Sequence, residues 1–171
     1  LDLLKDAGRD VIAVGKIFDI FDGEGVTEKI KTTGNTNGIA FTKALQTRDF
    51  EGLAFVNLVD FDMLYGHRRD VAGYAAAATE FDKFVADFIP GMREGDILMV
   101  TADHGCDPSY TKTTDHTREY VPYLICGKGV KPGVDLGTKL CFGTIAHTIC
   151  DYLGVDASTL DGQSVLGDIL A

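Results

Sequence analysis

Histidine and aspartate side chains occur together at three places in the sequence where they could bind a metal ion. The chain has only four histidines, and three of them, His67, His104 and His116, stand near the ends of predicted strands with an aspartate close by. Imidazole and carboxylate form a borderline-hard ligand set that suits Mn²⁺, Zn²⁺ or iron and is too rich in nitrogen for Ca²⁺. The spacing therefore suggests a metal site assembled from three separate segments.

Asp103 and His104 follow a strongly apolar run at residues 97–100, which predicts a buried strand. Neighbouring side chains on a strand point to opposite faces, so both could reach one ligand only where the strand has ended and the backbone turns. Gly105 permits such a turn. Ligands of open α/β sheets collect at the carboxyl ends of the strands, where we expect this pair to lie.

Asp62 and His67 are five positions apart, and on an α-helix this spacing is about 140° beyond one turn, so the two would not share a face. We expect them instead in a loop after an apolar strand at residues 53–59, where Gly66 helps the chain to bend. His116 stands in a polar loop at residues 107–118, just before the next strand.

Structural explanations of the same residues remain open at this point. A lone aspartate–histidine pair is commonly a surface hydrogen bond, and His67 beside Arg68 and Arg69 could be a solvated helix start. His116 could belong to a polar loop with internal salt bridges. Three such clusters at successive strand ends favour a metal site. His147 lies inside an amphipathic helix and is predicted to be structural.

The order of predicted elements indicates an α/β fold. Apolar runs predict strands, and periodic spacing of three and four predicts helices between them. This alternation predicts one domain with a mostly parallel sheet and helices on both faces. The strands are expected at residues 11–14, 53–59, 97–100 and 121–126, and the helices at residues 1–7, 36–45 (capped by Thr36 or Asn37), 71–89 and 142–153, with an irregular loop at residues 19–36.

Composition excludes some classes of partner. The formal net charge of −10 argues against a general surface for nucleic acid or anionic membranes. No apolar run reaches the roughly 20 residues that span a bilayer. The four cysteines form no C-x-x-C pair, and Cys126 and Cys150 lie in apolar runs, so we expect reduced core thiols and a cytoplasmic location.

Several motifs resemble a known family. Residues 101–105 (T-A-D-H-G), 115–119 (D-H-T-R-E) and 121–122 (V-P) are similar to the metal-binding core of the alkaline phosphatase superfamily. Residues 57–70, with the pattern D-F-D-x-x-x-G-H-R-R-D, resemble phosphopentomutases far more specifically. The segments at residues 15–17 and 162–167 also suit that family, so the resemblance covers essentially the whole chain and implies an alkaline-phosphatase-like core.

Phosphopentomutases are isomerases of nucleotide metabolism that move a phosphoryl group between C1 and C5 of ribose or 2-deoxyribose. They use two Mn²⁺ ions and a phosphothreonine. The resemblance thus implies a pentose phosphate substrate and assigns residues to roles as follows: Asp103 and His104 bind one ion, Asp62, His67 and His116 bind the other, and Lys16 contacts the phosphoryl group.

The phosphorylated threonine of the family, and a further aspartate ligand, belong to an N-terminal core segment that is followed by a cap domain. Neither precedes Leu1. The resemblance therefore implies that residues 1–171 are the C-terminal segment of the catalytic core, without a nucleophilic threonine and inactive alone. Alternatives are another enzyme of the superfamily, such as a cofactor-independent phosphoglycerate mutase or a phosphatase, and a non-catalytic metal-binding module.

Overall fold

A parallel sheet of three strands forms from the apolar runs in the first third of the chain. The computed structural model describes residues 1–170. Strand β1 (Asp10–Val14) lies between β2 (Glu28–Ile30) and β3 (Gly52–Val56), and all three run in one direction. Because β1 is paired on both edges and covered on both faces, all its residues after Asp10 are buried.

Two further strands form a separate antiparallel pair. Strand β4 (Ile97–Thr101) pairs with β5 (Tyr123–Gly127), so that Met99 lies opposite Ile125. The sequence predicted a mostly parallel sheet, which holds for the three-stranded sheet but not for this pair. The connection between β4 and β5 contains no helix to carry the chain back to the starting end, and parallel strands need such a crossover.

Helices cover both faces of the parallel sheet because successive strand side chains point to opposite sides. On one face, Val11 packs with Leu4 of α1 (Asp2–Asp6) and Cys150 of α5 (Gly143–Tyr152). This packing confirms the α/β class and the predicted helix at residues 142–153.

On the other face, Ile12 and Val14 pack against Leu45 of α3 (Asn35–Leu45). The residue that caps α3 is Gly34, two or three residues before the predicted caps Thr36 and Asn37. The side chain of Asn37 accepts a hydrogen bond from the Thr33 amide instead of capping the helix.

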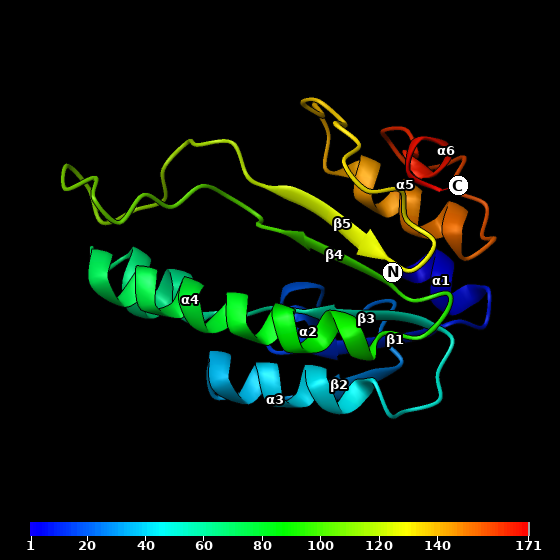
Figure 1. The fold of residues 1–171 in the computed structure, drawn as a ribbon, viewed down its shortest axis with the longest axis horizontal. Coiled ribbons are helices and arrows are strands. Elements are labelled where there is room, and N and C mark those ends of the chain that lie inside the picture. Colours follow the sequence, from blue (N-terminus) through cyan, green and yellow to red (C-terminus); the bar gives the residue numbers. More distant parts are fainter. Residues whose placement is uncertain (171) are drawn as a thin grey trace.

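The remaining helices complete the order of elements. The stretch at residues 19–36 is less irregular than predicted, because it contains β2 and the end of a short helix. In Figure 1, the longest helix, α4 (Val71–Phe88), and α5 lie on opposite sides of the β4–β5 pair. The helices not described above are α2 (Ile17–Ile20), the π-helix η1 (Phe61–Gly66), the 3₁₀ turn η2 (Ile89–Gly91) and α6 (Leu166–Ile169).

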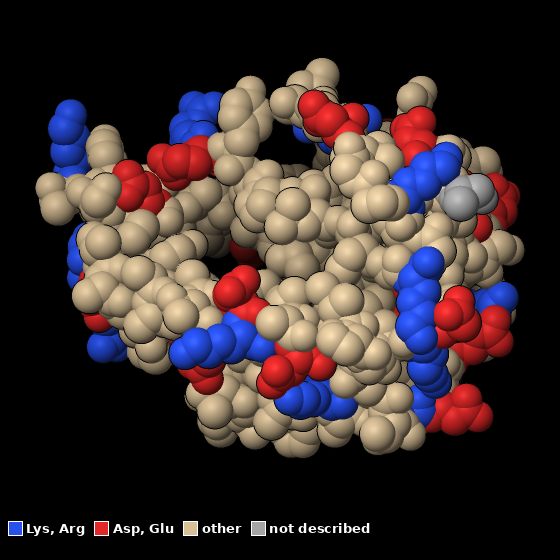
Figure 2. Space-filling model, in the orientation of Figure 1, with Lys and Arg blue, Asp and Glu red and all other residues tan. Residues whose placement is uncertain are grey.

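The charge distribution on the surface and the state of the cysteines can be compared with what the composition predicted. Figure 2 shows acidic and basic side chains interspersed over the visible face, without a large patch of one sign. All four cysteines are free thiols, with Cys150 buried and Cys141 exposed. Within residues 1–170, no helix has both the length and the apolar character that crossing a membrane requires.

The centre of β1 gives a test of this packing. Ile12 is 1% exposed, so Ile12→Ala should lower the free energy of unfolding by about 2–5 kcal/mol, measured by urea denaturation. The control is Ile20→Ala, whose side chain is 58% exposed; its effect should stay within about 0.5 kcal/mol. Equal effects at the two positions would contradict the assignment of β1 to the core.

Candidate metal centre

A π-helical turn brings Asp62 and His67 together. The His67 amide donates to the Asp62 carbonyl oxygen at 3.0 Å, which is the i→i+5 bond of a π-helix. Side chains five positions apart therefore meet, and His67 Nε2 lies 3.3 Å from Asp62 Oδ2. The sequence prediction that these residues lie in a loop was wrong, because the five-residue spacing was compared only with an α-helix and the segment forms a π-helix. Short π-helical turns are frequent at functional sites.

His104 reaches the same place from the end of β4. Gly105, which follows His104, does not have a positive φ. The expected turn therefore does not need glycine for a left-handed backbone conformation. A Cβ on Gly105 would lie 2.7 Å from the Glu119 amide nitrogen. Gly105 is therefore needed because the returning loop passes close to it, and its carbonyl oxygen accepts from the Thr117 amide at 3.1 Å.

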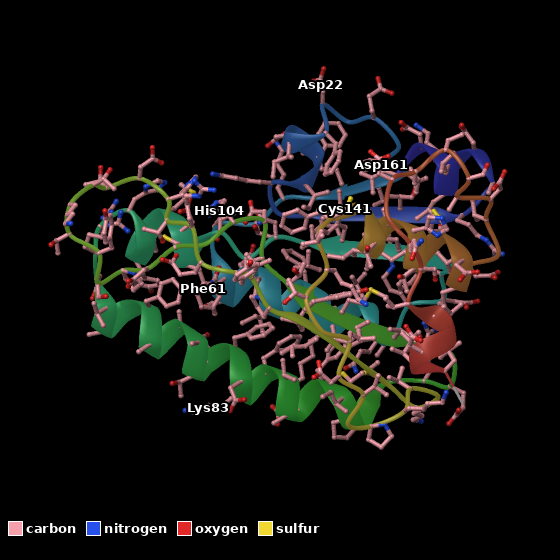
Figure 3. The ribbon with its side chains drawn as sticks, turned by 90° about the horizontal axis from the view of Figure 1, so that it is seen from above. Asp22, Phe61, Lys83, His104, Cys141 and Asp161 are labelled. Carbon is pink, nitrogen blue, oxygen red and sulfur yellow. The ribbon has the colours of Figure 1, made fainter. Side chains whose placement is uncertain are left out.

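His116 is brought in by that returning loop. Its Nε2 lies 3.4 Å from Asp62 Oδ1. Its ring stacks on His104 with centroids 3.6 Å apart, and the His67 ring is 4.9 Å away. Figure 3 shows His104 beside this loop, at the end of the molecule opposite α6. The three histidines predicted from separate segments thus meet around one carboxylate.

Hydrogen bonds on the far side of two rings determine which nitrogen faces the carboxylate. His67 Nδ1 lies 2.5 Å from the Thr114 carbonyl oxygen, and His104 Nδ1 lies 3.2 Å from that of Gly105. A carbonyl oxygen only accepts, so each Nδ1 carries the hydrogen and the neutral ring has its lone pair on Nε2. At His67 this lone pair faces a carboxylate oxygen, and two acceptors in contact require a cation or an extra proton between them.

The donor set therefore fits a divalent cation. Ligand atoms of Asp62, His104 and His116 all lie within 4.8 Å of one another. This trio combines residues that the resemblance assigned to two different ions. Asp103, the predicted partner of His104, is more peripheral: its side chain is 73% exposed, and its Oδ1 lies 3.7 Å from His104 Nε2.

Lys16, the predicted phosphoryl contact, lies at the margin of the cluster. It is the exposed residue that precedes α2. Its Nζ lies 2.9 Å from the sulfur of Met63, the residue that follows Asp62.

Sequence reasoning missed two residues beside the cluster, Cys106 and Arg69. Cys106 Sγ lies 3.9 Å from Asp62 Oδ1, and burial, followed by the Asp62 charge, raises the pKa of this thiol. The neutral thiol is thus favoured, as a weak donor to the carboxylate. The position of Cys106 directly after the T-A-D-H-G motif was the available signal. Arg69 contacts the loop that carries His116 and is described below.

Electrostatics also favour an ionised Asp115 next to His116. The backbone amide of His116 donates to Asp115 Oδ1 at 2.8 Å. This hydrogen bond, followed by the nearby His116 ring, lowers the pKa of the Asp115 carboxyl. A cavity of about 760 Å³ adjoins the cluster. Its lining includes Asp103 and His104, and both basic residues (Arg118, Lys131 and Lys139) and acidic ones (Glu119 and Asp135).

Close packing around the π-turn gives a second test. A Cβ on Gly66 would collide with Cys106 Sγ and lie 3.0 Å from the Phe61 carbonyl oxygen. Gly66→Ala should therefore destabilise the fold by about 1–3 kcal/mol, and adding Cys106→Ala should recover a large part of this loss. Urea denaturation measures both.

The control for this test is Gly129→Ala, since a Cβ there meets nothing within 4 Å. Its effect should stay within about 0.5 kcal/mol. Additive effects of Gly66→Ala and Cys106→Ala would contradict the contact between the π-turn and the thiol.

Three comparisons place this chain among known proteins. Phosphopentomutases of Acetivibrio thermocellus and Lachnoclostridium phytofermentans are each 52% identical to it over 170 residues, covering 99% of this chain and 43% of the relative. The phosphopentomutase of Symbiobacterium thermophilum is 53% identical over 155 residues, covering 91% of this chain and 39% of the relative. The chain thus spans less than half the length of these relatives.

Among solved structures, the fold resembles Leishmania mexicana phosphoglycerate mutase, determined at low cobalt concentration. The TM-score is 0.74 with 17% sequence identity, covering 95% of this chain and 38% of that protein. At this identity the likeness supports the fold alone, and it agrees with the predicted alkaline-phosphatase-like core. Residues 4–157 match the sequence model of the Metalloenzyme superfamily, and the chain therefore belongs to that superfamily.

Proposed function

We propose that this chain provides metal ligands of a phosphopentomutase, which interconverts the 1-phosphate and 5-phosphate of ribose or 2-deoxyribose. The observation that carries the proposal is the convergence of three imidazoles on the Asp62 carboxylate. This convergence occurs in a chain whose similar relatives are named phosphopentomutases.

In this proposal the residues hold two Mn²⁺ ions. Asp62, His67 and His116 would bind one ion, and Asp103 with His104 would contribute to the other. The backbone carbonyl oxygens of Thr114 and Gly105 orient two of the rings, and such partners typically keep an imidazole in the tautomer that can bind metal. The nitrogen-rich donor set supports Mn²⁺ over Ca²⁺.

When bound, the cations would stabilise the negative charge that phosphoryl transfer places on oxygen and would lower the pKa of a coordinated hydroxyl. The chain itself would supply orientation and charge. Lys16 would balance the charge of the phosphoryl group from the margin of the cluster.

The rest of the site would come from outside these 171 residues. We propose that residues 1–171 are the C-terminal segment of the catalytic core, and that the phosphothreonine, a further aspartate ligand and a cap domain belong to other parts of the polypeptide. The relatives are more than twice as long as the matched segment, which supports this division. Free cysteines support a cytoplasmic location.

Metal binding tests the ligand assignment. In the full-length protein, Asp62→Asn and His67→Ala should each weaken Mn²⁺ binding by more than about 100-fold in calorimetric titration. Mutation of a group that only hydrogen-bonds a metal ligand already lowers metal affinity by about 10–100-fold. His147→Ala is the matched control, because this fourth histidine lies on α5 outside the cluster, and it should leave the affinity unchanged. Equal binding by all variants would refute the assignment.

Substrate turnover tests the reaction. The full-length protein with Mn²⁺ should convert ribose 1-phosphate to ribose 5-phosphate, and Asp62→Asn should abolish this turnover without unfolding the protein. The 171-residue chain alone should convert neither phosphate, because the proposed threonine lies outside it. Exclusive turnover of 3-phosphoglycerate would instead support a phosphoglycerate mutase. Metal binding with no turnover of either substrate would support a non-catalytic module.

A further inference from the structure

The loop that carries His116 has little structure of its own. Residues 109–116 are all exposed, and the connection from β4 to β5 contains no helix. A histidine on such a loop would sample many positions. The entropy cost of ordering it would lower its affinity for any metal ion that it binds. A specific set of contacts must therefore keep His116 next to Asp62.

One guanidinium group supplies most of these contacts. Arg69 donates from Nε and Nη2 to the Thr113 carbonyl oxygen at 2.9 and 2.6 Å. Its Nη1 donates to the carbonyl oxygens of Asp107 and Gly66, each at 3.1 Å. Its Nη2 also donates to the Asp115 carbonyl oxygen. An arginine has five N–H groups, and these five contacts match them, joining both ends of the loop to the π-turn.

The backbone of Arg69 gives a second, independent observation. Its φ is +55°, in the left-handed region that residues with a Cβ rarely adopt. Only one other non-glycine residue of the described part, Asp22, shares this feature. Glycine would avoid the steric cost of this conformation. A strained arginine is retained where its side chain does something that glycine cannot do.

We propose that Arg69 positions His116 for metal binding by fastening residues 107–115 to the end of η1. The proposal rests on the proposed function only in taking His116 as a metal ligand. Arg69 contacts no ligand atom of the cluster and is a positioning residue. Lysine could not replace it, because an ammonium group is a point charge with three donors and cannot span the planar set of carbonyl oxygens.

The first experiment compares loop order without metal. Hydrogen–deuterium exchange of the metal-free, full-length protein should become more than about 10-fold faster across residues 107–116 in both Arg69→Lys and Arg69→Gly. The glycine variant relieves the backbone strain, so faster exchange there assigns the effect to the side chain. Arg68→Lys, a change at an exposed neighbour, is the matched control and should leave exchange unchanged. Unchanged exchange in the Arg69 variants would overturn the proposal.

The second experiment measures Mn²⁺ affinity of the same proteins by calorimetry. Arg69→Lys and Arg69→Gly should bind Mn²⁺ at least about 10-fold more weakly than the unaltered protein, and Arg68→Lys should bind it equally. Added guanidinium ion should partly restore the affinity of Arg69→Gly and should leave that of Arg68→Lys unchanged. Faster loop exchange with unchanged affinity, or no restoration by guanidinium, would overturn the positioning role.

The two experiments separate this proposal from the one on which it rests. If the unaltered protein binds no Mn²⁺, the proposed function fails, while the exchange comparison still decides whether Arg69 fastens the loop. If the unaltered protein binds Mn²⁺ and His116→Ala does so equally well, His116 is not a ligand and the positioning role fails with it.

Discussion

The Asp62 carboxylate lies close to the Nε2 atoms of two histidines, and the contact with His67 is the one on which the rest of the site depends. His67 Nε2 lies 3.3 Å from one of its oxygens, and His116 Nε2 lies 3.4 Å from the other. With His67 Nδ1 held at the Thr114 carbonyl oxygen, a neutral His67 ring presents a lone pair to a negative oxygen. This contact is unfavourable unless a positive charge lies between the two groups, and the proposed cations meet that requirement.

Three separate structural features bring these groups together. A π-helical turn replaces the α-helical spacing that would have turned His67 away from Asp62. A close approach at Gly105 lets the loop return past the end of β4. The Arg69 guanidinium then fastens that loop at both of its ends. Each feature costs stability or conformational freedom, and all of them lie within the same small region, as expected where local structure serves a binding site.

The sequence predicted the parts whose signals are local. Apolar runs and periodicity located β1, β4, α4 and α5 within a few residues, because burial and side-chain spacing determine them directly. The gathering of three histidines was predicted from their positions at strand ends. The π-turn at η1 was not predicted because only α-helical spacing was considered. The antiparallel direction of β5 was not predicted because it depends on a connection without a helix between β4 and β5. The role of Arg69 was missed because its partners in the loop, such as Asp107 and Thr113, lie 38 and 44 residues away in the sequence.

The most direct measurement of the central claim is anomalous X-ray diffraction at the manganese absorption edge, from crystals of the full-length protein grown with Mn²⁺. The account predicts a strong peak within coordination distance of a carboxylate oxygen of Asp62 and of Nε2 of both His67 and His116, with a second peak next to Asp103 and His104. Manganese bound elsewhere on the molecule, with Asp62 and the three histidines bonded only to one another or to water, would contradict it.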